Sequence, residues 1–150
     1  MRKIARSREA GFSVSAYIWN KATIDIYLFE LADELSAARY ELKAASARLT
    51  QAERRLASQS AAEAKEPLPS WYEVAELAEH NASALIGRLC ARIAAVPARS
   101  KAGLAIKLLL LSDMFADDEA PISEIINRGD IGAKLVTSVL RDIGTTSSSK

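Results

Sequence analysis

Residues 28–56 read LFELADELSAARYELKAASARLTQAERRL, and leucine recurs in them every seventh residue. Three residues after each of the first four leucines stands another leucine or an alanine. The resulting series is Leu28, Leu31, Leu35, Ala38, Leu42, Ala45, Leu49, Ala52 and Leu56. A repeat of seven with an inner spacing of three and four is typical of a long helix with one narrow apolar seam. Such a seam needs a partner, either elsewhere in the chain or in another copy.

The composition favours a single helical domain. The chain has 150 residues, 49% of them hydrophobic, with only six Gly and four Pro. Ala, Leu, Glu and Arg are abundant, and these residues favour helix. Lys and Arg number 20 against 19 acidic residues. The net charge is therefore too small to indicate binding to nucleic acid, a membrane surface or an acidic substrate. We therefore predict an all-α fold.

Cysteine usage and hydropathy predict a cytoplasmic protein without a membrane span. Cys90 is the only cysteine, which suits a reducing compartment, and we interpret it as a small buried hydrophobe. The basic start is not followed by a signal-peptide core or cleavage site. The most apolar run, Leu104 to Leu111, is interrupted by Lys107 and is far shorter than the ~20 residues that cross a bilayer.

We predict one domain spanning 1–150. Residues that typically begin or end helices divide it into segments. We expect a basic tail (1–12), a long helix (13–58), a connection (59–70), a second helix (71–96), shorter helices (100–143) and a disordered tail (144–150). Ser70 and Glu73 fit a capping box at the start of the second helix. Ser100 fits an N-cap of the third helix and Asp130 one of the last helix.

Packing volume favours an antiparallel partner for the seam. In an antiparallel pair each layer holds one Leu facing one Ala, whereas a parallel homodimer alternates thick and thin layers. Charge pairing does not distinguish the two orientations. Parallel pairing brings Glu34 near Arg39, and antiparallel pairing brings Glu41 near Arg48 and Glu34 near Arg55. The second helix carries an Ala-rich stripe. We therefore expect a long antiparallel, coiled-coil-like hairpin within the chain on a base of three shorter helices, with a spare face that could form a homodimer.

No catalytic, metal or cofactor motif stands out. His80 is the only histidine, and with one cysteine it cannot supply the three or four ligands of a metal site. The acids around 113–119 lack the spacing of a calcium loop. We expect no enzyme activity, no cofactor and no small-molecule substrate.

Two features leave nucleic-acid binding open as the alternative function. The N-terminal arm carries Arg2, Lys3, Arg6 and Arg8, and Arg99 and Lys101 add two further basic side chains as candidate phosphate contacts. Residues 122–141 have the length of a helix–turn–helix. However, that alignment places Arg128, Asp130 and Ser138 where core residues belong, so we interpret the segment as two helices of the base.

Residues 89–107 contain an apolar helix, then Pro97, Ser100, Ala102, Gly103 and Lys107. This segment resembles a stretch in small uncharacterised bacterial helical proteins with a Pro-x-x-Ser/Thr-x-Ala-Gly pattern, although Arg99 replaces the usual Thr. The resemblance implies a bacterial, cytoplasmic origin and a helical fold, and since that group has no assigned activity it implies nothing about activity. Physically, the segment indicates a helix stop, an N-cap and a glycine for close packing, or else a glycine that admits an anion to N–H groups beside Arg99 and Lys101.

The leading hypothesis from the sequence is a non-enzymatic interaction or adaptor protein. It would bind another macromolecule, or associate with a second copy of itself, through helical faces. Binding to nucleic acid through the basic arm is the alternative.

Overall fold

The computed structural model describes residues 25–58, 68–116 and 120–147, and these contain helices and no strand. The helices are α2 (Ile26–Ala57), α3 (Ser70–Ala95), α4 (Lys101–Met114), α5 (Ile122–Asn127) and α6 (Ile131–Ser147). The predicted all-α class is confirmed. In the described part of the chain, no helix combines the length and apolarity that a bilayer crossing requires.

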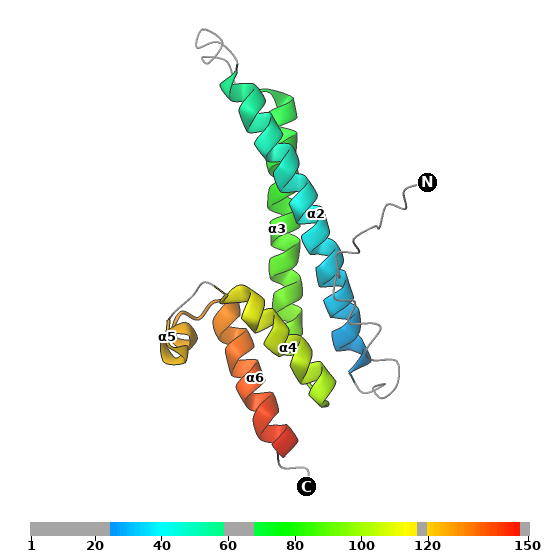
Figure 1. The fold of residues 1–150 in the computed structure, drawn as a ribbon, viewed down its shortest axis with the longest axis vertical. Coiled ribbons are helices and arrows are strands. Elements are labelled where there is room, and N and C mark those ends of the chain that lie inside the picture. Colours follow the sequence, from blue (N-terminus) through cyan, green and yellow to red (C-terminus); the bar gives the residue numbers. More distant parts are fainter. Residues whose placement is uncertain (1–24, 59–67, 117–119, 148–150) are drawn as a thin grey trace, which may run out of the picture.

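Helices α2 and α3 run side by side in opposite directions over most of their length (Figure 1). The seam of α2 faces α3, as the heptad spacing requires. Leu28, Leu31 and Leu35 are buried near one end of the pair, and Ala38, Ala45 and Ala52 continue the buried row toward the other end. The arrangement is consistent with the predicted hairpin.

Helices α4, α5 and α6 gather at the end of the pair where α2 begins and α3 ends (Figure 1). There α6 packs against α3 and α4, and α5 packs against α6. The main core lies at this end, where Leu28 and Leu31 meet Leu89, Ile93 and residues of α4 and α6. Beyond the base, α2 and α3 pack mainly against each other within the described part of the chain.

The starts of α2 and α3 differ from the predicted ones. The prediction placed Asp25 inside a helix over 13–58, but Asp25 precedes α2 as its N-cap, with non-helical φ −117° and ψ 27°. Residues 13–24 of that helix lie outside the described residues, as do the predicted basic tail (1–12), residues 59–67 of the connection, and residues 148–150 at the end of the predicted disordered tail. The capping box at Ser70 was wrong, because Pro69 is the N-cap and no side chain caps α3.

The other two predicted caps are confirmed. The Ser100 hydroxyl accepts a hydrogen bond from the Gly103 amide (3.1 Å), and the Asp130 carboxylate accepts one from the Ala133 amide (2.8 Å). Each satisfies an amide that the first turn of a helix leaves without a partner. Gly129, which precedes Asp130, has φ +68° and allows the sharp turn between α5 and α6.

Candidate interaction surface

The loop between α3 and α4 binds two carboxylates with three consecutive backbone amides. The Ala98 amide donates to Asp142 Oδ2 (2.9 Å). The Arg99 and Ser100 amides donate to the Asp25 carboxylate (3.0 and 2.9 Å), and the Ser100 hydroxyl donates to it as well (2.6 Å). One acid comes from the start of α2 and the other from α6. The loop thereby ties the hairpin to the base.

Asp25 also explains why a glycine stands at position 103. A Cβ on Gly103 would overlap the Asp25 carboxylate, which lies against the first turn of α4. The sequence allowed either close packing or an anion beside Gly103, and the structure combines the two, because the anion is a carboxylate of the chain itself. The side chains of Arg99 and Lys101 remain exposed.

Replacing Gly103 with alanine should destabilise the fold by about 1–3 kcal/mol, the usual cost of forcing an extra methyl into a packed site. The Asp25 carboxylate would have to move away from its three donors. Urea denaturation followed by circular dichroism measures the effect. Gly144→Ala is the matched control: a Cβ there meets nothing within 4 Å, so it should be neutral or stabilise the helix. Equal stabilities of the two variants would contradict this account of Gly103.

A fully buried ion pair joins α4 to α6. Lys107 and Asp142 have side chains 0% and 1% exposed, and Lys107 Nζ lies 2.6 Å from Asp142 Oδ2. The same ammonium donates to the Ser138 hydroxyl (2.7 Å). Burial works to raise the pKa of Asp142, but its hydrogen bonds from Lys107 and the Ala98 amide and the nearby positive charges outweigh burial and lower that pKa. Asp142 is therefore held as a carboxylate.

The predicted seam residues form the interior of the hairpin. Leu28, Leu31, Leu35 and the three seam alanines are buried. Leu42, Leu49 and Leu56 are partly buried along the half of α2 beyond the base. None of the nine is among the large hydrophobic residues that the structure leaves exposed. The seam leucines and alanines are therefore packed within the hairpin instead of forming an exposed surface.

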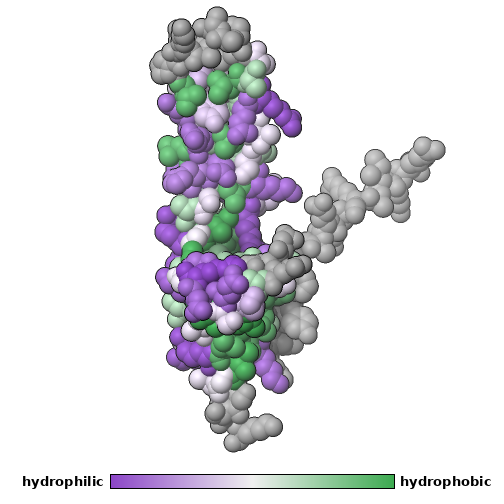
Figure 2. Space-filling view, turned by 90° about the vertical axis from the view of Figure 1, so that its left-hand side faces the viewer, coloured by the Kyte–Doolittle hydropathy of each residue, from purple (hydrophilic) through white to green (hydrophobic). Residues whose placement is uncertain are grey.

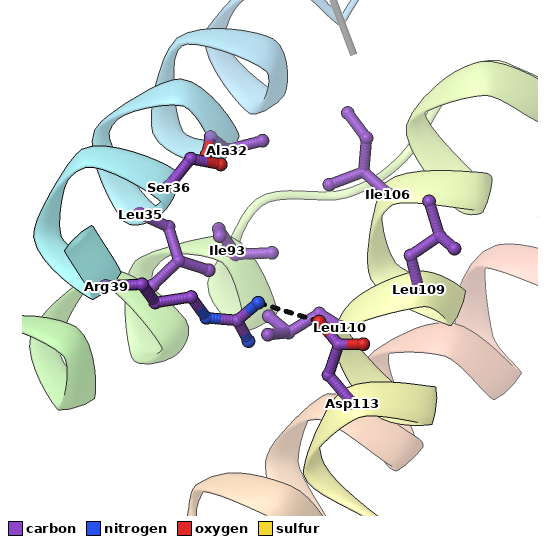
Figure 3. A pocket seen from close by; sticks show the side chains of 9 residues that line it. All are labelled: Ala32, Leu35, Ser36, Arg39, Ile93, Ile106, Leu109, Leu110 and Asp113. Carbon is purple, nitrogen blue, oxygen red and sulfur yellow. Dashed lines mark hydrogen bonds and ion pairs between the residues drawn. The ribbon is translucent and has the colours of Figure 1, made fainter. Parts of the chain in front are cut away.

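A cavity of about 400 Å³ lies between α2, α3 and α4 (Figure 3). Its walls are mostly apolar, with Leu35, Ile93 and Leu110 among the residues that line it. Arg39 of α2 reaches across to Asp113 of α4, with 2.7 Å between guanidinium nitrogen and carboxylate oxygen. Both charged groups of the cavity are thus engaged with each other. The cavity offers apolar contact more than polar chemistry.

One side of α3 exposes a row of large apolar side chains. Val74, Leu77 and Leu85 are 67%, 59% and 40% exposed, and their spacing places them on the same side of the helix. Asn81 and Arg88, both exposed, continue the row. Figure 2, which presents the side of the molecule that carries the base, shows hydrophobic and hydrophilic residues interspersed along the hairpin beyond the base. Val74, Leu77 and Leu85 are the large hydrophobic residues that the described part of α3 leaves exposed.

Contacts between the helices show which side of α2 lies beside this row. Arg92 donates to the Tyr27 hydroxyl (2.7 Å) and pairs with Glu34 (3.4 Å) near the base. At the far end the Arg55 guanidinium stacks on the Trp71 ring, 4.6 Å from its centroid. Tyr27, Glu34 and Arg55 share one heptad position, which Glu41 and Arg48 fill between them. We call this side of the hairpin the lateral face; its described residues are Tyr27, Glu34, Glu41, Arg48, Arg55, Trp71, Val74, Leu77, Asn81, Leu85, Arg88 and Arg92.

The base packs against the other side of the hairpin. Gly87, two positions and therefore about 200° round the helix from Leu85, lies beside Ile131 of α6. Arg39, two positions from Glu41, pairs with α4. Ser46 and Glu79, which are hydrogen-bonded at 3.4 Å, also lie on that side. The lateral face is consequently left open by the described helices.

Of the remaining residues that the sequence singled out, those in the described ranges do not form a cluster. The arm residues Arg2, Lys3, Arg6 and Arg8 lie outside the described residues. His80 is exposed on α3 and Cys90 is buried, and burial raises the pKa of the Cys90 thiol. Within the described ranges no three His, Cys, Asp or Glu side chains are grouped as metal ligands would be.

Comparison of the chain with protein-family models, with curated proteins and with solved structures found no match.

Proposed function

We propose that this chain is a non-enzymatic interaction protein that binds a protein partner through the lateral face of its α2–α3 hairpin. The observation that carries the proposal is the exposed row Val74, Leu77 and Leu85 on α3. Apolar side chains of this size gain free energy when they leave water, by ~25 cal/mol for each Å² buried. Their position on one side of one helix suits a helical partner.

The construction of the base supports this role. At one end, the loop between α3 and α4 donates hydrogen bonds to Asp142 of α6 and to Asp25 at the start of α2, and these bonds fix the hairpin to the base. The rest of the hairpin extends beyond the base (Figure 1), and none of the described helices of the base packs on its lateral face. A rigid, projecting pair of helices presents its side chains in a defined geometry, so binding costs little ordering of the backbone.

Site-specific photo-crosslinking in cells that produce the intact protein tests the proposal. A benzophenone amino acid at Leu77 or Leu85 should give protein adducts, since both side chains would lie in the interface. The control is the same amino acid at Tyr40, which is 74% exposed and lies on the side of α2 away from α3. Adducts at position 40 as abundant as those at position 77 would contradict the proposal. Adducts sensitive to nuclease would instead favour the nucleic-acid alternative.

A further inference from the structure

The charges of the lateral face on α2 are complementary to themselves in the antiparallel sense. Its heptad position holds Glu34 and Glu41 toward the base and Arg48 and Arg55 toward the far end. If a second α2 runs antiparallel to the first about a point midway between Glu41 and Arg48, every Glu meets an Arg. A parallel alignment in register would place like charges together, which is unfavourable.

The row on α3 has the same symmetry. Antiparallel pairing centred on Asn81 sets Leu77 against Leu85 of the second copy, and Leu85 against Leu77. It sets Val74 against the aliphatic stem of Arg88, which can cover apolar surface while its charge stays in water. Asn81 then meets its own equivalent on the axis, where two amide side chains can each donate and accept a hydrogen bond.

The two centres coincide along the hairpin. Within one chain Glu34 lies beside Arg92, Ser46 is bonded to Glu79, and Arg55 stacks on Trp71. This register places the midpoint between Glu41 and Arg48 opposite Asn81 to within about one residue, or ~1.5 Å along the axis. A single two-fold axis, perpendicular to the helices, therefore relates both α2 and α3 to their equivalents in the second copy.

We infer that the partner of the lateral face is a second copy of this chain, bound about that two-fold axis to form an antiparallel four-helix bundle. The inference rests on the proposed function and names its partner. Each contact then occurs twice, as in any two-fold interface. The two bases lie at opposite ends of the bundle and on its outer sides, because each packs on the side of its hairpin away from the lateral face.

The area available is that of a modest but specific dimer. The lateral face spans about 20 residues of α3, or ~30 Å, and two helix diameters, or ~20 Å, giving roughly 600 Å² on each copy. Standard stable interfaces bury about 800 Å² on each partner. We therefore expect a dimer that dissociates on dilution rather than an obligate one.

Sedimentation equilibrium of the full chain should show a reversible monomer–dimer equilibrium. Leu77→Glu combined with Leu85→Glu should give a monomer, since both side chains are exposed in the single chain. At dilutions where the unchanged chain is also monomeric, the two should match in helical content and melting temperature. Tyr40→Glu, on the opposite side, is the control and should leave the dimer intact. A monomeric mass for the unchanged chain at every concentration up to the millimolar range would overturn the inference.

Charge reversal tests which residues meet. Glu41→Arg alone, or Arg48→Glu alone, sets like charges together twice in each dimer and should weaken it about tenfold. The double reversal should restore the dimer, because each copy then again offers one charge of each sign. The two residues are ~10 Å apart along one helix, too far for a direct pair within the chain. Failure of the double reversal to restore the dimer would contradict the two-fold pairing.

A cysteine crosslink locates the axis. In a Cys90→Ala background, Asn81→Cys should form a disulfide between copies under mild oxidation, since the two positions meet on the axis. Leu77→Cys should not, because the two copies of position 77 are about eight residues, or ~12 Å, apart along the bundle, beyond the ~7 Å limit between Cα atoms. Efficient crosslinking at both positions would indicate a parallel dimer and overturn the arrangement.

The crosslinking at Leu77 described above separates the two proposals. Adducts of twice the chain mass support both. Adducts of another mass would overturn the homodimer and leave the proposed function standing, whereas a lack of adducts at Leu77 and Leu85 would overturn both.

Discussion

Replacing Lys107 with methionine should destabilise the protein by about 3–5 kcal/mol, the cost of removing one partner from a buried ion pair. Methionine fills a similar volume but leaves the Asp142 carboxylate without its closest cation, in a site where Asp142 is 1% exposed. The Ser138 hydroxyl loses a hydrogen bond at the same time. Urea unfolding monitored by circular dichroism measures the change, and it should appear as a lower midpoint.

Two controls separate the charge effect from general damage to the helices. Lys101→Met removes an exposed lysine from the same helix and should change stability by no more than about 0.5 kcal/mol. Adding Asp142→Asn to Lys107→Met removes the uncompensated charge, so the double variant should be more stable than the sum of the single effects predicts. A loss below 1 kcal/mol for Lys107→Met would show that Asp142 is not held in this way.

Leu31→Ala should cost about 3–5 kcal/mol, as large-to-small changes do at fully buried core positions that cannot collapse. Leu31 is 0% exposed and belongs to the core cluster that joins the hairpin to the base. Shortening its side chain leaves a cavity among residues of several helices. Neither the hairpin nor the base can fill this cavity by shifting alone. The measurement is again the free energy of unfolding.

The matched change on the lateral face has a different outcome. Leu77→Ala removes the same atoms from an exposed position and should leave the stability of the monomer within about 0.5 kcal/mol of the unchanged chain. Leu56→Ala, near the end of α2 where burial is partial, should lie between these extremes. Similar losses at Leu31 and Leu77 would contradict the assignment of one to the core and the other to a surface.

Six of the nine predicted seam residues are buried, and the sequence could indicate them because a heptad pattern is local. Leu28, Leu31 and Leu35 repeat at a spacing that only a helix brings to one side, whatever the rest of the chain does. The caps at Ser100 and Asp130 were predictable for the same reason, since a cap joins residues three apart. Ser70 failed as a cap because Pro69, one residue earlier, already ends the extended segment.

The buried charges were missed because their partners are distant in sequence. Lys107 carried a signal, a lone lysine inside an eight-residue apolar run, but its partner Asp142 stands 35 residues away. Asp25 accepts a hydrogen bond from the Ser100 amide, which lies 75 residues further along the sequence. Nothing in the local pattern distinguishes these acids from exposed ones. The lateral face was missed for a related reason, since its two halves become neighbours only when α3 packs on α2.

The sequence by itself therefore determined the helical class, the residues of the seam and two of the helix caps, because periodicity and capping act within a few residues. Only the tertiary structure decided which acids are buried, why Gly103 must lack a side chain, and which side of the hairpin is left open. These features depend on contacts between helices, where the desolvation of a charge or the exposure of a leucine is set by what packs against it.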